Sequence, residues 1–165
     1  MERERNMLHV LARKFRQCVR ALVLPVVVLA VIFAAPTDAF AAGADRQLIE
    51  SAESGGAAAV ERLLAGGADV DHQGANGTTA LFMASQNGHG AIVQALLAKG
   101  AAIDVQANNG VTALLLASGF GHSEIVATLL AKGANTALQI KDGRIALEFA
   151  RNAAIENMLR AAAKP

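Results

Sequence analysis

The apolar positions of this chain recur with a fixed spacing. The pattern Ala-Leu-x-x-Ala begins at positions 80, 113 and 146, so the step between successive copies is constant. Between these blocks, Ile92, Val93, Leu96 and Leu97 follow the spacing i, i+1, i+4, i+5, which places all four on one face of a helix. The same residue types return at 125, 126, 129 and 130. The pattern predicts two short helices in each unit, with these leucines, isoleucines and valines in the core.

Turn and cap signals stand before the first helix of each unit. Asn76-Gly77 and Asn109-Gly110 are turn dipeptides, because both residue types tolerate positive φ. Thr79 and Thr112 then stand where a hydroxyl can accept hydrogen bonds from the first helical amides. We therefore expect a tight turn to lead directly into a capped helix.

Glycines mark where the predicted helices end. Gly88 and Gly121 follow the first helix and suit a left-handed stop, since glycine has no Cβ to clash there. Gly100 and Gly133 are placed to end the second helix. Each unit is thus predicted to run turn, helix, glycine turn, helix and loop.

The constant step between copies indicates a solenoid, in which each unit must stack on its neighbours to bury its apolar face. Two nearly full copies are flanked by two divergent ones. In the last copy, Met158 and Leu159 take the place of the Ile-Val pair, and Ala162 and Ala163 fall where the paired leucines stood. We expect the divergent copies to cap the two ends of the array.

The order of turn, helix, Gly-His turn, helix and Leu-Leu-x-x-Gly-Ala resembles the ankyrin repeat. The resemblance runs from about Gly43 to the C-terminus and includes His89 and His122 in the Gly-His steps. It implies an all-α fold: an ankyrin-repeat solenoid of about four helix-turn-helix repeats with short β-turn loops. The domain would cover 42–165, with repeats at approximately 43–75, 76–108, 109–141 and 142–165.

The chain departs from the Thr-Pro-Leu-His signature of that family. The corresponding residues read Thr79-Ala-Leu-Phe82 and Thr112-Ala-Leu-Leu115, and the last copy reads Ile145-Ala-Leu-Glu148. The missing proline removes a preset φ at the first helical position. The missing histidine removes hydrogen bonds that the resemblance implies between repeats, so Phe82 and Leu115 are expected to replace polar linkage by packing.

The segment 1–41 differs in character from the repeats. Six basic side chains precede or flank an apolar run at 21–35, and Ala39-Phe40-Ala41 follows it. These parts predict a secretory signal peptide at 1–41, cleaved after Ala41. An uncleaved anchor is the alternative, although an anchor needs about 20 apolar residues, and this run is shorter and contains Pro25. Either way we expect a periplasmic or secreted repeat domain that meets the membrane only through this segment.

Removing the segment 1–41 changes the charge of the protein. The full chain has 15 basic and 14 acidic side chains, and the leader holds six of the former and three of the latter. The remaining nine basic and eleven acidic groups give a net charge of about −2 and no basic stripe, so no nucleic-acid partner is expected. The single cysteine, Cys18, also lies in the leader, which suits an oxidising compartment.

Candidate catalytic or metal-binding groups are few after residue 41. His72, His89 and His122 are not completed to a zinc site by a Cys, Asp or Glu cluster, so the last two are expected to be structural and His72 solvated. Asp69, Asp71 and Asp104 fall in the connecting loops. There we expect each carboxylate to bond its own backbone, as aspartate often does in turns. We predict no metal, no cofactor and no enzymatic activity.

The resemblance implies that the loop tips and the outward side of the first helices form a concave binding face for an unidentified protein. Candidate binding residues are Gln73, Asn76, Thr78, Gln86, Asn87, Gln106, Asn109, Val111, Phe120, Lys141 and Arg144. Phe120, Val111 and Arg144 are predicted to form the centre of this patch. The alternative for Phe120 is packing against the last repeat, beside Arg151 or Ala153.

Three function classes follow. The first is an exported, monomeric, non-enzymatic module that binds another protein through the concave face. The second is a protective or inhibitory accessory factor for a periplasmic enzyme or envelope component, and the third is an unrecognised enzyme. A repeat scaffold does not by itself name a partner.

Overall fold

The computed structural model describes residues 37–163. The predicted signal peptide therefore lies outside the described residues except for 37–41, which form the first turn of a helix. The elements are α2 (Thr37–Ser54), α3 (Ala57–Ala65), η1 (Ala75–Gly77), α4 (Ala80–Asn87), α5 (Gly90–Ala98), α6 (Ala113–Phe120), α7 (Ser123–Ala131), η2 (Ala146–Phe149) and α8 (Ala153–Ala162).

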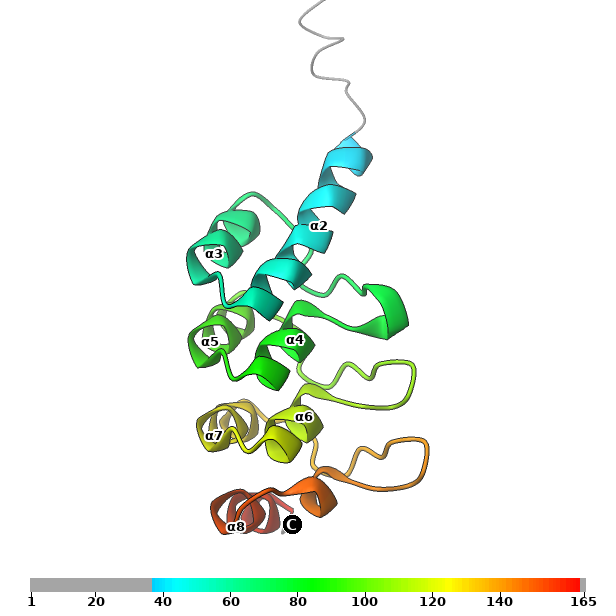
Figure 1. Ribbon diagram of the computed structural model, residues 1–165, viewed down its shortest axis with the longest axis vertical. Coiled ribbons are helices and arrows are strands. Elements are labelled where there is room, and N and C mark those ends of the chain that lie inside the picture. The colour runs from blue at the N-terminus through cyan, green and yellow to red at the C-terminus, as the bar shows by residue number, and fades with distance from the viewer. Residues whose placement is uncertain (1–36, 164–165) are drawn as a thin grey trace, which may run out of the picture. The chain divides into compact units, whose positions relative to one another are not determined.

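The helices form antiparallel pairs that stack on one another (Figure 1). One column holds α2, α4, α6 and η2, and the other holds α3, α5, α7 and α8. The long loops that connect successive helix pairs project to the same side. Between residues 37 and 163, strand-like pairing is limited to an isolated antiparallel bridge between Gln139 and Ile145. The predicted all-α solenoid is confirmed.

The predicted caps of the first helices are present. The Thr79 hydroxyl accepts a hydrogen bond from the Phe82 amide, and the Thr112 hydroxyl accepts one from the Leu115 amide, both at 3.3 Å. Gly88 ends α4 in the left-handed conformation, with φ of 80°. The helices α4 and α6 therefore begin directly after the threonines that the sequence indicates, and Gly88 follows α4 as expected.

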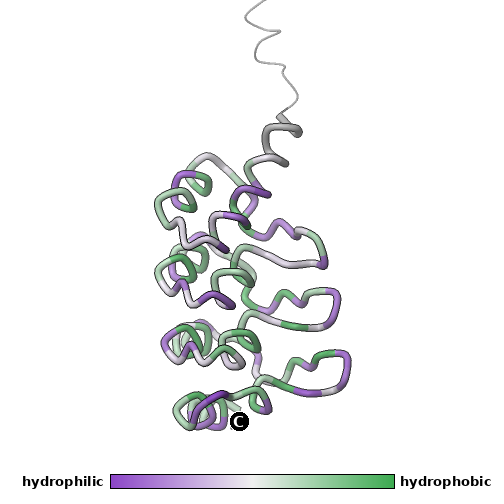
Figure 2. The backbone as a smooth tube through the Cα atoms, viewed as in Figure 1, coloured by the Kyte–Doolittle hydropathy of each residue, from purple (hydrophilic) through white to green (hydrophobic). Residues whose placement is uncertain are grey.

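The core follows the stacking direction and is continuous from α2 to α8. The largest fully buried side chains are Leu48, Val60, Leu81, Ile92, Val93, Leu96, Leu114, Val126, Leu129, Ile155 and Leu159. Leu97 and Leu130 are only partly buried and pack on the edge of this core. The prediction that both leucines of each pair are core residues is wrong, because the second leucine lies at the margin of the buried helix face. Along the backbone, hydrophilic residues concentrate at the loop tips (Figure 2).

The last repeat is shorter than the others, and this shifts its second helix. Its first helix is reduced to the single turn η2, and Asn152 caps α8 by accepting a hydrogen bond from the Ile155 amide at 2.9 Å. Ile155 and Leu159 are 0% and 1% exposed, whereas Met158 is partly buried. The predicted equivalence of Met158-Leu159 with Ile125-Val126 is therefore wrong. Ile155 and Leu159 occupy the places of Ile125 and Leu129.

In the part of the chain that the structure describes, no helix has both the length and the hydropathy needed to cross a bilayer.

Candidate functional site

The loops between repeats end in tight turns, which we call fingers and which cover residues 74–78, 107–111 and 140–144. In the second finger the Ala107 amide donates to the Val111 carbonyl oxygen at 2.9 Å, and the other two fingers repeat this bond. Asn76 adopts a left-handed φ of 65°, so its turn uses the tolerance that the sequence indicates. Each finger is a short, closed hairpin whose tip is exposed.

Adjacent fingers are bonded to each other. The Asn108 amide donates to the Asn76 carbonyl oxygen at 2.9 Å, and the Lys141 amide donates to the Asn109 carbonyl oxygen at 3.2 Å. The Gln106 side chain adds a bridge, since Nε2 lies 3.1 Å from the carbonyl oxygens of both Gly110 and Gln139. The finger tips therefore hold fixed positions relative to one another.

Aspartates join the loops behind the fingers. The Asp71 carboxylate accepts a hydrogen bond from the Ala102 amide at 2.8 Å, and Asp104 accepts one from the Asn135 amide at 2.9 Å. The expectation that these two carboxylates bond their own turns is wrong, because the next repeat offers a free amide within reach. Asp69 does bond its own turn, through the Asp71 amide at 3.0 Å.

His72 is less exposed than the sequence analysis expects. Its Nδ1 lies 3.9 Å from Oδ2 of Asp45, and its side chain is 35% exposed. Asp45 is itself buried and accepts a hydrogen bond from the Asp69 amide at 2.7 Å. His72 is thus solvated only in part, since its ring also lies beside the Asp45 carboxylate of α2.

The two histidines of the Gly-His steps connect one repeat to the repeat before it. His89 Nε2 lies 3.1 Å from the Glu53 carbonyl oxygen, and His122 Nε2 lies 3.0 Å from the Gln86 carbonyl oxygen. The expected structural role of these rings is thus observed. Leu115 is buried in the core, as expected, whereas Phe82 is only partly buried. The rings of His89 and His122 add polar linkage between repeats at a different position.

Phe120 is 52% exposed and is the exposed large hydrophobic residue of the segment 43–163. Its ring is nearly parallel to that of His122, with centroids 6.4 Å apart and an interplanar angle of 8°. It stands at the C-terminal end of α6, whereas Val111 precedes the N-terminal end. At a helical rise of about 1.5 Å per residue, α6 itself spans roughly 10 Å from its first to its last residue, and Val111 lies two residues before it. The structure thus places two members of the predicted patch at opposite ends of α6.

Arg144 is held by its own finger. Its Nε lies 2.8 Å and its Nη2 lies 2.6 Å from Oδ2 of Asp142, and its guanidinium carbon lies 4.4 Å from the centroid of the Phe149 ring. The hydrogen bond from Arg144 lowers the pKa of the Asp142 carboxyl, and the same contact raises the pKa of Arg144. The charge of Arg144 is therefore largely compensated at the finger tip.

The eleven candidate residues fall into three groups. Side-chain hydrogen bonds within the scaffold engage Thr78, Asn87, Gln106, Asn109 and Arg144. Val111 and Gln86 are partly buried. Gln73, Asn76, Lys141 and Phe120 are exposed and make no side-chain hydrogen bond within the segment 43–163. The last group contains the side chains that the repeats do not use.

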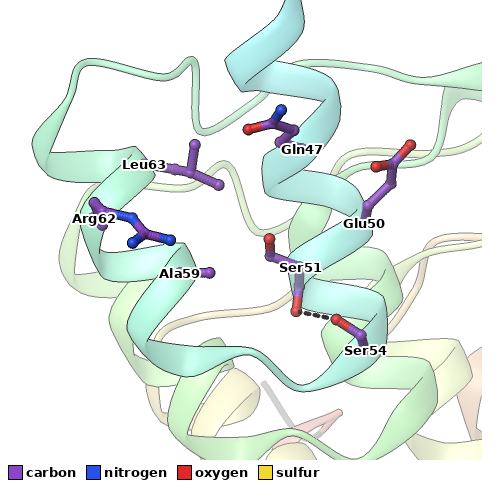
Figure 3. Close-up of a pocket in the computed structure, with 7 residues that line it drawn as sticks. All are labelled: Gln47, Glu50, Ser51, Ser54, Ala59, Arg62 and Leu63. Carbon is purple, nitrogen blue, oxygen red and sulfur yellow. Dashed lines mark hydrogen bonds between the residues drawn. The ribbon is translucent and has the colours of Figure 1, made fainter.

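A pocket of about 400 Å³ lies between α2 and α3 (Figure 3). Its lining residues are Gln47, Glu50, Ser51, Ser54, Ala59, Arg62 and Leu63. One repeat later, the positions of Gln47, Ser51, Ala59 and Leu63 are taken by Ala80, Ala84, Ile92 and Leu96, all buried. The pocket is therefore the stacking face of the first repeat, with polar or smaller residues in three of these four places, as expected for an end cap.

The described segment 43–163 contains no group of three or more His, Cys, Asp or Glu side chains arranged to hold a metal ion. His89 and His122 bond backbone carbonyl oxygens, and the loop aspartates Asp69, Asp71 and Asp104 bond backbone amides. Sequence reasoning named Arg151 only as a packing neighbour of Phe120 and did not foresee that its side chain covers the turn at Gly121, in the place where His89 and His122 cover earlier turns. The sequence signal for it is the Gly-His pair, which occurs at 88–89 and 121–122 and is absent from the last repeat. Another side chain therefore has to cover the turn at Gly121.

Comparison with known proteins gives one family. A family model described as ankyrin repeats, in three copies, matches residues 48–140, which is more than half of the chain. No curated protein matches the sequence. Repeats of this family generally mediate contacts between proteins, in agreement with exposed fingers on a packed scaffold. The chain belongs to the ankyrin-repeat family.

Proposed function

We propose that this protein is an exported, non-enzymatic module that binds another protein through its fingers and the adjoining ends of the first helices. The observation that carries the proposal is the bonding of adjacent fingers through Asn76, Asn108, Asn109 and Lys141. A surface already fixed before binding loses little conformational entropy when a partner docks. Exposed polar tips on such a fixed frame suit recognition of a folded surface or peptide.

The hydrogen bonds made by the histidines and aspartates support a non-enzymatic role. His89 and His122 bond backbone carbonyl oxygens, and Asp71 and Asp104 bond backbone amides. These are structural bonds that span neighbouring repeats. A general acid or base needs a side chain free to exchange a proton with a substrate, and these four groups are committed to the scaffold.

The leader sequence supports export. In the full chain, cleavage after Ala41 would leave Ala42 as the new N-terminus, which intact mass measurement of the purified protein detects. A fusion of the full chain to a phosphatase that is active only outside the cytoplasm adds an independent test. We expect an active reporter and the shortened mass. An inactive reporter would remove export from the proposal, and an active reporter with the full mass would indicate the uncleaved anchor.

The binding face is tested by comparing two exposed substitutions in the full chain. Lys141→Glu changes a finger tip, whereas Gln94→Glu changes the exposed side of α5 in the other helix column. Cross-linking followed by mass spectrometry should recover the same partner with wild type and Gln94→Glu but not with Lys141→Glu. Equal recovery from all three would show that the fingers are not the binding face.

A further inference from the structure

We propose that the turn around Gly121 binds a peptide segment of the partner in which an apolar side chain lies next to a carboxylate. The site consists of Phe120, His122 and Arg151. It rests on the proposed function, because it assigns a partner chemistry to a protein-binding module. It is separate from the finger tips, since Phe120 and Val111 flank α6 at opposite ends.

The first observation is that Phe120 stands where the preceding repeat has an asparagine. Asn87 occupies the place of Phe120 one repeat earlier, and its Nδ2 donates to the Glu53 carbonyl oxygen at 3.0 Å, beside the bond from His89. Phe120 has no donor, so the equivalent carbonyl oxygen of Gln86 receives only the bond from His122. The scaffold loses a hydrogen bond here and exposes an aromatic ring to water. Stability of the array does not explain this exchange, whereas an anchor for a partner does.

The second observation concerns Arg151. If Gly121 carried a Cβ, that atom would lie 3.2 Å from Cδ of Arg151 and 3.6 Å from its Cβ, so the Arg151 stem lies across the turn. His89 and His122 cover Gly55 and Gly88 in the same way. The third turn therefore carries an arginine where the earlier turns carry imidazole rings.

Arg151 is exposed, and its guanidinium forms no ion pair within the segment 43–163. By contrast, Arg46, Arg144 and Arg160 each pair with a carboxylate two or four positions away. Arg62 also makes no ion pair there, but it lies in the first repeat, far along the stack from this turn. Glu124, in the first turn of α7, is exposed and does not pair with Arg151.

Together these groups define the chemistry of the occupant. The Phe120 ring is supported on one side by the nearly parallel ring of His122 and leaves apolar surface exposed. The Arg151 stem crosses the turn between Phe120 and His122, and its charge is available for a carboxylate, which guanidinium groups bind in a bidentate manner. An apolar side chain followed closely by Asp or Glu satisfies both parts.

Random-peptide display on the full chain tests the assignment. We expect selected peptides to carry Asp or Glu within about two residues of Leu, Phe or Trp, the separation over which neighbouring side chains of a peptide can reach one site. Phe120→Asn is the matched variant, because it restores the residue that the preceding repeat uses at this position. It should weaken binding of the selected peptide at least about tenfold, as expected for loss of an interface anchor.

Arg151→Gln should weaken the same peptide and remove most of the salt dependence of its affinity. Replacing the peptide's acidic residue by Lys should abolish binding to the wild-type protein, which tests the chemistry without any change to the protein. Selected peptides without an acidic residue, or equal affinity for wild type and Phe120→Asn, would overturn the proposal. So would binding of anionic lipid vesicles that Phe120→Asn and Arg151→Gln both reduce while the peptide remains unaffected.

Failure of this proposal is distinguishable from failure of the proposed function. Peptides whose affinity falls with Lys141→Glu but not with Phe120→Asn would place binding at the fingers alone. In that case the protein-binding function stands and the Gly121 site does not.

Discussion

The imidazole of His122 is hydrogen-bonded to the Gln86 carbonyl oxygen of the preceding repeat, at 3.0 Å. A carbonyl oxygen only accepts, so Nε2 must carry the proton in this contact. The same ring lies over Gly88, where a Cβ would approach its Cε1 to 2.7 Å. One side chain thus joins two repeats and restricts the residue that can stand at the turn between them.

Removing this ring should destabilise the array. We expect His122→Ala to lower the free energy of unfolding by about 1–3 kcal/mol, because the Gln86 carbonyl loses its donor and the ring loses its packing. Urea denaturation followed by circular dichroism of the helical signal measures the change. Gln94→Ala, on the exposed side of α5, is the control and should remain within about 0.5 kcal/mol of wild type. An equal effect of both substitutions would contradict the role given to His122.

The turn glycines provide a matched pair. Gly88 and Gly133 both adopt positive φ, at 80° and 88°, so alanine at either position meets the same left-handed strain of roughly 1–2 kcal/mol. Only at Gly88 would the new methyl group also overlap the His122 ring, since nothing lies within 4 Å at Gly133. Gly88→Ala should therefore be the more destabilising of the two in thermal unfolding. Equal losses would show that the ring moves aside without cost.

The buried face of α8 predicts which of its apolar residues contributes most to the free energy of unfolding. Ile155→Ala should cost about 2–5 kcal/mol, since Ile155 is fully buried, whereas Met158→Ala should cost clearly less because Met158 is partly buried. The same comparison applies to Leu96 and Leu97 in α5. Equilibrium denaturation of the single variants measures both pairs. A larger loss at Met158 than at Ile155 would support an unshifted repeat register and contradict the structure.

The Asp142–Arg144 pair predicts a limited dependence on pH. Because the pKa of Asp142 is lowered below its ordinary value of 3.8, its contribution is present above that value and is lost as pH falls through the folded-state pKa. NMR titration of the Asp142 carboxyl carbon should show the pKa rise toward 3.8 in Arg144→Gln. The stability difference between this variant and wild type should be constant at neutral pH and shrink in acid. An unchanged Asp142 titration would contradict the pairing.

The sequence predicts those features that depend on contacts within one repeat. Thr79, Thr112, Gly88 and Gly121 act within a turn or a helix end, so residue type and spacing determine their conformation. Features that cross repeats were predicted less well. The bonds from His89, Asp71 and Gln106 depend on how far one repeat stacks from the next, which local spacing does not encode.

The last repeat shows a second limit of sequence reasoning. The residues from Ile145 to Phe149 keep the 33-residue spacing of the earlier copies. The spacing therefore gives no sign that the first helix of this repeat is one turn shorter. A better signal was Asn152, a strong cap residue placed three positions before Ile155. The sequence also does not separate exposed binding residues from those that stabilise the scaffold. Gln106 and Asn87 each carry an amide side chain whose hydrogen-bond acceptor, a backbone carbonyl oxygen of another segment, is known only from the structure.

The bonds between neighbouring fingers have a consequence for the evolution of the surface. Asn108 and Lys141 make these contacts through their backbone amides, so their side chains take no part in them. Under the proposed function, substitutions of these two side chains would alter what the protein recognises while the spacing between the tips stays constant. The spacing between the finger tips is therefore fixed, whereas the side chains of Asn108 and Lys141 can change one at a time. A ligand that contacts more than one finger has to match that spacing.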